Sequence, residues 1–217
     1  MRITLIGLGK MGSLIKKIAL EQGHILLPSD EIANSDVVID FALAEGILDR
    51  IAHVSSFQKP HLIGTTGWDK ELLKGREISE KNGGSLLFAP NFSLGMALFL
   101  QLLKQARLLF QDYDVAGVEW HHREKKDAPS GTSLAIGEAL GMQEPFASVR
   151  LGSLPGTHQV TFSSPFDSIH LTHEAHNREG LAVGALKAAE WLYNQKKTGW
   201  YTLEDLVRSL YSTHHPL

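Results

Sequence analysis

The chain opens with a short strand, a glycine-rich turn and a helix, and this order limits the folds available to it. Residues 3–6 are mostly β-branched and apolar, and they run directly into Gly7-Leu8-Gly9-Lys10-Met11-Gly12. Apolar residues then recur at helical spacing until Gly23. Further strand patterns cover 24–27, 36–41, 61–63 and 85–89, with helical patterns over 45–54 and 69–81. This alternation predicts an α/β fold with a parallel, doubly wound sheet.

The pattern changes after Phe92. A long helix is predicted over 95–111, and a strand rich in Val and aromatic residues over 113–120. Two strand patterns, 158–163 and 168–175, then follow each other without a helix between them, which is typical of an antiparallel α+β arrangement. Residues 181–195 and 203–211 are helical again, with Thr202 as a predicted N-cap.

Composition excludes several classes of protein. The net charge of −3 gives no reason to expect binding to nucleic acid or to an anionic membrane. The chain has no Cys, which excludes disulfides and thiolate zinc sites. Its longest apolar stretch, near 96–103, is too short to span a bilayer, and the N-terminus lacks the pattern of a signal peptide. We therefore expect a cytoplasmic protein.

The spacing G-x-G-x-x-G is a weak signal alone, but here it follows a strand and opens a helix. In that context Gly7 allows the tight turn, Gly9 admits a pyrophosphate, and Gly12 lets the helix pack closely on the strand. We therefore predict dinucleotide binding, with a purely structural glycine turn as the alternative.

The adenine side of this predicted cofactor site is unusually short. Asp30 lies where an acidic residue would bind the adenine ribose, although a turn residue or helix cap is an equally good interpretation. Only residues 28–35 separate the second strand from the next, too few for an ordinary helical crossover. Either that strand is short or the adenine side is open. No Arg lies nearby to bind a 2′-phosphate, which favours NADH slightly.

The segment from His121 to Thr132 concentrates proton donors and cations between a strand and a helix start. Residues 130–140 are helical, and Gly141 follows as a stop. We expect the first free N–H groups of that helix to come from Ser130, Gly131 and Thr132 and to bind a carboxylate. The alternative is a solvated surface loop.

Metal binding is not expected, although the sequence contains several histidines. His121 and His122 are consecutive strand residues, so their side chains point to opposite faces. His170 and His173 are three apart in a strand, which places them on opposite faces too, and His176 follows. Glu119 can orient His121, but a structural strand carboxylate is the favoured interpretation.

Taken together, these segments resemble the dihydrodipicolinate reductase (4-hydroxy-tetrahydrodipicolinate reductase) family of the diaminopimelate–lysine pathway. The matching segments cover nearly the whole chain in order, and His121–Thr132 is the most specific of them. The others are 6–12, 37–41, 64–67, 89–92, Arg150, Gly152, Gly156, His158, 171–173 and 184–192.

The resemblance implies a Rossmann-like cofactor domain over 1–92, an inserted α+β domain with an antiparallel or mixed sheet over 93–178, and C-terminal helices over 179–217 that return to the first domain. The inserted domain would bind substrate and build a homotetramer through its sheets. The implied reaction reduces the dihydrodipicolinate system, a small dicarboxylate, with NADH or NADPH.

The resemblance also implies roles for individual residues. His121 and Lys125 would be the acid–base pair, and His122, Gly131 and Thr132 would bind a substrate carboxylate. The pyrophosphate would lie on Gly7, Gly9, Lys10, Met11 and Gly12. The nicotinamide side would be lined by Gly64, Thr65, Thr66, Ala89, Pro90, Asn91 and Phe92.

The residues themselves agree with this chemistry. The cofactor supplies a hydride, so the protein must orient the substrate and provide a proton, which Lys125 can donate. We expect the positive neighbours Arg123, Lys126 and His122 to favour release of that proton. Another imine or keto-acid reductase, or a non-catalytic nucleotide-binding module, remain the alternatives.

The chain departs from the family pattern at a few places. It is shorter than typical members after Gly23, and Lys10 replaces the usual arginine of the glycine loop. Glu174 stands at a commonly basic position, and 179–181 replace an aromatic-containing stretch. The first two differences concern cofactor preference, and the last two concern packing between domains or subunits.

Overall fold

The computed structural model describes residues 1–142 and 146–212. The chain divides into two compact units. The first contains Met1–Leu94 together with the C-terminal segment from Glu179, and the second contains Gly95–Arg178. Each unit has its own sheet.

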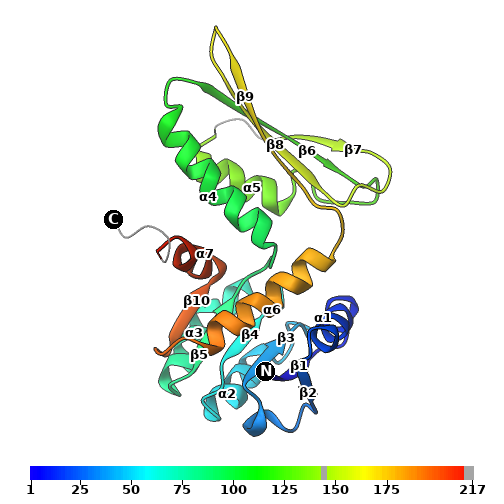
Figure 1. Ribbon diagram of the computed structural model, residues 1–217, viewed down its shortest axis with the longest axis vertical. Coiled ribbons are helices and arrows are strands. Elements are labelled where there is room, and N and C mark those ends of the chain that lie inside the picture. Colours follow the sequence, from blue (N-terminus) through cyan, green and yellow to red (C-terminus); the bar gives the residue numbers. More distant parts are fainter. Residues whose placement is uncertain (143–145, 213–217) are drawn as a thin grey trace. The chain divides into compact units, whose positions relative to one another are not determined.

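The first unit is built on a six-stranded sheet in which every paired strand is parallel (Figure 1). The strand order is β10-β5-β4-β3-β1-β2. The strands are β1 (Arg2–Ile6), β2 (Ile25–Leu27), β3 (Val37–Asp40), β4 (His61–Ile63), β5 (Ser85–Phe88) and β10 (Gly199–Thr202). The predicted doubly wound parallel sheet is confirmed, whereas β10 was not predicted.

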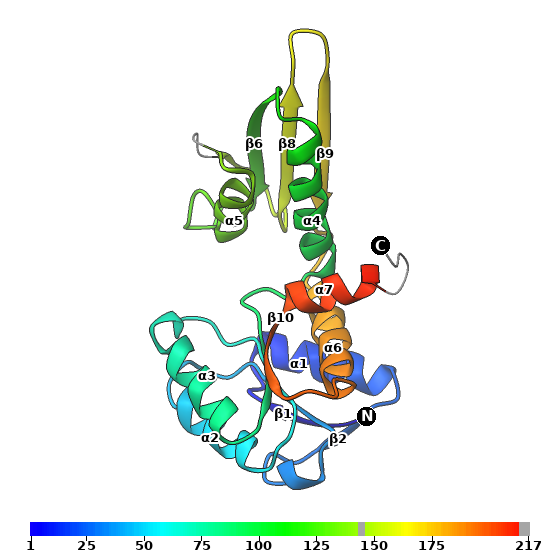
Figure 2. The ribbon, with the colours of Figure 1, turned by 90° about the vertical axis from the view of Figure 1, so that its left-hand side faces the viewer.

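Helices cover both faces of this sheet, as Figure 2 shows. Helix α1 (Lys10–Glu21) packs against α6 (Glu179–Tyr193), and α2 (Ile47–Ser56) packs against α3 (Leu72–Lys81). All four residues of the central strand β3 are buried, which is what a parallel strand covered on both faces requires. Helix α7 (Leu203–Ser212) follows β10, and the backbone N–H and hydroxyl of Thr202 donate to Asp205 in its first turn.

The connection from β2 to β3 explains the shortened adenine side. It contains only the 3-10 turn Ile32–Asn34, and Ile32 buries its side chain against Val38 and Val54. A short edge strand and a single buried anchor thus replace an ordinary crossover helix. Both features that the sequence suggested, a short strand and a missing helix, are present.

The second unit contains a four-stranded mixed sheet in the order β7-β6-β8-β9. Its strands are β6 (Asp114–His121), β7 (Ala147–Arg150), β8 (Thr157–Ser163) and β9 (Ser168–Glu174). The β6–β8 and β8–β9 pairs are antiparallel, as expected, and the unpredicted β7 runs parallel to β6.

Two helices, α4 (Leu94–Leu109) and α5 (Gly131–Leu140), lie over one face of this sheet (Figure 2). Alternate residues of β8, including Val160 and Phe162, are buried against them. They form one apolar core with Phe99, Leu103 and Ile136. None of the helices in the two described ranges combines the length and apolar character needed to cross a membrane.

A buried ion pair joins β3 to α2 in the first unit. The carboxylate of Asp40 is fully buried and accepts hydrogen bonds from the Nε of Arg50, at 2.7 Å, and the backbone N–H of Ala42, at 2.9 Å. Arg50 also donates to the carbonyl groups of Leu43 and Glu45. Burial alone would raise the pKa of Asp40, but the interaction with His61 first, and then the hydrogen bonds from Arg50 and Ala42, outweigh burial and lower it.

We predict that Asp40→Asn destabilises the protein by about 3 kcal/mol near neutral pH, because it leaves the partly buried Arg50 without its counter-ion. Urea denaturation followed by circular dichroism measures this difference. Because the folded pKa of Asp40 is lowered, the stabilisation is complete above the unfolded value of about 4 and is lost as pH falls through the folded value. The difference in the free energy of unfolding between the wild type and the variant is therefore expected to decrease only below about pH 4.

The exposed Glu77, on α3, provides a matched control. Glu77→Gln removes the same charge and is expected to change stability by less than about 0.5 kcal/mol. Equal stability of Asp40→Asn and Glu77→Gln at pH 7 would contradict the assigned role of the ion pair.

Candidate active site

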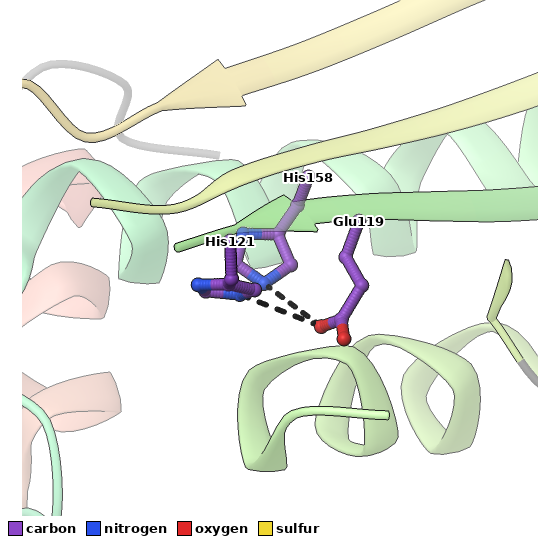
Figure 3. A group of neighbouring side chains, drawn as sticks. All are labelled: Glu119, His121 and His158. Carbon is purple, nitrogen blue, oxygen red and sulfur yellow. Dashed lines mark ion pairs between the residues drawn. The ribbon is translucent and has the colours of Figure 1, made fainter. Parts of the chain in front are cut away.

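Three buried polar side chains meet at the inner face of the second sheet, beside the start of α5 (Figure 3). Glu119 and His121 are two apart in β6 and therefore point to the same face. His158, on β8, is the direct cross-strand partner of Glu119. The Oε2 atom of Glu119 lies 3.5 Å from His121 Nε2 and 3.9 Å from His158 Nε2.

The carboxylate of Glu119 is saturated with hydrogen bonds from two other elements. From the start of α5 it accepts the Ser133 hydroxyl at 2.6 Å and the Ser130 backbone N–H at 3.1 Å. From β7 it accepts the Ser148 hydroxyl at 2.8 Å and the Arg150 guanidinium at 3.1 Å. Burial alone would raise the pKa of Glu119, but the hydrogen bonds of the three serines outweigh burial and lower it to about 2. Glu119 is therefore ionised at neutral pH.

Opposing effects act on the pKa of His121. Burial lowers its pKa, while the charge of Glu119 and a hydrogen bond to the carbonyl group of Pro155 raise it. The positive charges of Lys125 and Arg150 lower it further. The net result is a lowered pKa, so the resting side chain is a neutral imidazole with a buried anion close to one ring nitrogen.

His158 is held neutral even more firmly. Burial and the neighbouring His121 lower its pKa to about 4, against the opposing charge of Glu119. Its Nε2 lies 3.3 Å from the Ser130 hydroxyl, and its ring packs edge-on against the ring of His121 with centroids 5.2 Å apart. His158 thus adds a polar but uncharged wall to the site.

The loop after β6 places Lys125 next to a carboxylate of the chain itself. Its Nζ lies 2.8 and 3.0 Å from the two oxygens of Asp127. The same carboxylate accepts a hydrogen bond from the backbone of Gly131, and Lys125 is the main cause of its lowered pKa. An anion is therefore in direct contact with Lys125, in addition to the positive neighbours that the sequence places around it. His122 is partly buried at the start of this loop.

The helix start offers fewer free N–H groups than predicted. Ser130 is the N-cap of α5, and its hydroxyl accepts a hydrogen bond from the backbone of Ser133. The backbone N–H of Ser130 donates to Glu119, so its prediction as a free anion donor is wrong. Gly131 and Thr132 begin the first turn of α5, and the backbone N–H of Gly131 donates to Asp127. A Cβ atom added at Gly131 would meet no atom within 4 Å, which leaves this backbone open to a ligand.

The glycine loop of the first unit has the geometry that a pyrophosphate needs. Gly7 adopts φ +84°, a conformation that favours glycine. A Cβ atom added at Gly12 would collide with the carbonyl oxygen of Gly7, whereas one at Gly9 would meet nothing within 4 Å. Gly9, Lys10 and Met11 begin α1, with Gly9 at the N-cap. The backbone around Gly9 can therefore be approached closely.

The other predicted cofactor residues follow the carboxyl ends of β4 and β5, at the same edge of the sheet as the glycine loop. Gly64 packs against the ring of Phe41, and the buried Thr65 donates its hydroxyl to the carbonyl of Ala42. Phe92 is buried against Phe41 with ring centroids 5.7 Å apart. The remaining four are Thr66, Pro90 and Asn91, which are exposed, and Ala89, which is buried. Asp30 is exposed in the turn after β2.

Several members of the buried cluster could not be found from local sequence patterns. Ser148 and Arg150 lie on β7, a strand that was not predicted, and Ser133 looked like an ordinary helix residue. Arg150 and His158 were identified as candidates only because they match the family pattern. Among the histidines of β9, His170 is exposed and His173 is partly buried, as strand alternation requires.

Comparisons with known proteins agree over nearly the whole chain. A family model for the N-terminal part of dihydrodipicolinate reductase matches residues 25–92, and one for the C-terminal part matches residues 95–207. Proteins from Christiangramia forsetii and Thermosipho africanus, both named 4-hydroxy-tetrahydrodipicolinate reductase, are each 34% identical to this chain. Both alignments cover 97% of this chain, with 99% and 100% of the respective relative.

Solved structures show the same fold. A dipicolinate-bound dihydrodipicolinate reductase from Paenisporosarcina sp. TG-14 superposes with a TM-score of 0.78 at 22% identity, covering 94% of this chain and 98% of that one. A diaminopimelate dehydrogenase from C. glutamicum gives a TM-score of 0.61 at 10% identity, covering 94% and 93%.

The position of the His121 ring depends on the glycine beside it. Gly156 adopts φ +152°, and a Cβ atom added there would lie 2.7 Å from His121 Cε1. We predict that Gly156→Ala destabilises the protein by about 1–3 kcal/mol, because the ring must shift and the backbone is strained. Gly137→Ala, inside α5 and with no atom within 4 Å of the added Cβ, is expected to be neutral or stabilising. Urea denaturation of both variants tests this, and similar effects at the two glycines would contradict it.

Proposed function

The chain belongs to the dihydrodipicolinate reductase family, and we propose that it reduces 4-hydroxy-tetrahydrodipicolinate, or its dehydrated form dihydrodipicolinate, to tetrahydrodipicolinate with NADH or NADPH. This reaction belongs to the diaminopimelate–lysine pathway. The family models together span both units, and the two relatives align along their full length with this chain.

The observation that carries the site assignment is the carboxylate held by the His121–Thr132 segment. The ammonium group of Lys125 and the backbone of Gly131 both bind Asp127. A cation beside backbone N–H groups at a helix start is a carboxylate-binding arrangement, and the proposed substrate is a dicarboxylate that would take the place of Asp127 there. We assign substrate carboxylate binding to Gly131 and Thr132, with His122 as a further contact.

The nicotinamide cofactor supplies the hydride, and the protein has to supply a proton. We assign the proton donor to Lys125, which is charged and partly exposed at the loop. His121 is its acid–base partner, because a neutral imidazole beside the buried Glu119 can accept a proton and pass it on.

We assign the first unit to the cofactor. The open backbone at Gly9 and the helix start at Lys10 and Met11 would hold the pyrophosphate, with Gly7 and Gly12 shaping the turn. Asp30 would face the adenine ribose. The nicotinamide side would be formed by Gly64, Thr65, Thr66, Ala89, Pro90, Asn91 and Phe92. The acidic residue after β2, without a nearby Arg, favours NADH over NADPH.

Lys125→Ala is predicted to lower kcat/KM by about 10²–10³-fold, because general acid catalysis contributes on this scale, while the Kd for NADH stays nearly unchanged. The assay follows oxidation of NADH and of NADPH at 340 nm, with substrate freshly formed from aspartate semialdehyde and pyruvate. The exposed Lys126 provides the matched control, and Lys126→Ala should retain turnover within about threefold. Turnover by Lys125→Ala at the wild-type rate would refute the role of this lysine. A wild type that reduces other imino or keto acids but not this substrate would refute the proposed function.

We further propose that the second unit, besides binding substrate, assembles the chain into a homotetramer through its sheet. Support comes from the exposed outer residues of β9 and from Phe166, which is 94% exposed in the β8–β9 turn. Large aromatic side chains such as Phe166 are enriched at protein–protein interfaces.

Light scattering coupled to size-exclusion chromatography is expected to give the mass of four 23.9 kDa chains, about 96 kDa. Phe166→Asp is expected to lower that mass, whereas Leu73→Asp, at an exposed position of α3 in the first unit, is not. A wild-type mass of one chain at micromolar concentration would contradict the assembly.

A further inference from the structure

Among the described residues of the second unit, Glu119 is the only ionisable residue with no solvent exposure. Its carboxylate contacts both His121 and the start of α5. We propose that Glu119 is a positioning residue, whose carboxylate fixes the start of α5 for substrate binding and stabilises a proton on His121 during turnover. This inference rests on the proposed function, since it concerns the same site.

The first part of the argument is mechanical. The backbone N–H of Ser130 and the hydroxyl of Ser133 both bind Glu119, so the first turn of α5 is attached to β6 at its N-cap. This attachment uses the N–H group that lies just before Gly131 and Thr132. The two N–H groups proposed to bind substrate therefore have a fixed direction before substrate arrives.

The second part of the argument is electrostatic. The guanidinium of Arg150 binds the Oε1 atom of Glu119, whereas both imidazoles face the Oε2 atom. The negatively charged Oε2 atom lies 3.5 Å from His121 Nε2, and the Glu119 side chain has no solvent exposure. Burial reduces screening, so this charge stabilises an imidazolium at His121 more strongly than a surface carboxylate can.

The other charged groups around His121 disfavour protonation of its imidazole. Lys125 and Arg150 are cations, and their charges disfavour an imidazolium. His158 stays neutral, with a pKa of about 4, and the carbonyl of Pro155 accepts a hydrogen bond from the ring. Of the groups that act most strongly on His121, Glu119 is the anion, so its removal leaves the cations unopposed.

A metal site is the competing interpretation of the same cluster. Glu119, His121 and His158 each offer a ligand atom, and these atoms lie within 4.8 Å of one another. However, the oxygens of Glu119 already accept hydrogen bonds from three serines and from the Arg150 guanidinium. A divalent cation would have to displace donors and lie near a fixed positive charge, so the geometry favours a counter-ion over a metal ligand.

The test uses Glu119→Gln, which keeps the size of the side chain and removes its charge. In the full-length protein, ¹⁵N NMR of the imidazole nitrogens follows the titration of His121, assigned by comparison with His121→Gln. We expect the midpoint to fall by about one pH unit, as for loss of an opposite charge at this distance. The pH limb of kcat/KM that belongs to His121 should move to lower pH by a similar amount.

Two further variants make the result specific. Glu138→Gln removes an exposed carboxylate from α5 and should leave the His121 midpoint unchanged. Arg150→Gln removes a cation and should raise that midpoint, the opposite direction from Glu119→Gln. Because Arg150→Gln retains Glu119, it still tests the electrostatic argument if Glu119→Gln does not fold.

An unchanged His121 midpoint in folded Glu119→Gln, or a lowered midpoint in Arg150→Gln, overturns the proposal. Tight binding of Zn²⁺ by the wild type, lost in His158→Gln, overturns it in favour of a metal site. The NMR titration needs no turnover, whereas the wild-type assay with the dicarboxylate substrate tests the proposed function, so the two can fail separately.

Discussion

The architecture of the second unit depends on burying one ionised carboxylate. An isolated carboxylate is very costly to remove from water, so Glu119 is tolerated only because donors surround it. Those donors come from the start of α5, which follows the loop after β6, and from β7, which lies further along the chain. Satisfying this single charge therefore fixes how strand, helix and edge strand meet, and the loop with Lys125 runs between two of them.

In the first unit the corresponding constraint is the parallel sheet. Parallel strands present their carboxyl ends at one edge, so the turns after β1, β4 and β5 meet there although they are far apart in the chain. The Asp40–Arg50 pair ties the end of β3 to α2 at the same edge. Beyond β1, the short strand β2 and the 3-10 turn after it save residues without disturbing this edge, which explains how a short chain retains the cofactor-binding turns.

Sequence patterns predicted most helices and strands because hydrophobic periodicity and glycine stops are local signals. Sequence patterns did not predict β7 and β10, because these strands are short and are defined only by their pairing with β6 and β5, respectively. The site was predicted unevenly for the same reason. His121, Lys125 and the helix start share one segment, whereas Ser148, Arg150 and His158 reach Glu119 only through the fold. The Lys125–Asp127 contact is local, but which of the loop's charges Lys125 meets depends on loop geometry.

The two buried carboxylates differ in where their cation lies. At Asp40, Arg50 binds the Oδ2 atom, the same oxygen that lies 3.7 Å from the buried His61, so the cation competes with any charge on that imidazole. At Glu119, Arg150 binds Oε1, whereas Oε2 accepts hydrogen bonds from Ser130 and Ser133 and faces both imidazoles. The charge of Asp40 stabilises the contact between strand β3 and helix α2, so Asp40 and Arg50 form a structural ion pair. The charge of Glu119 also acts on the His121 ring, which must gain and lose a proton, and this makes Glu119 a positioning residue.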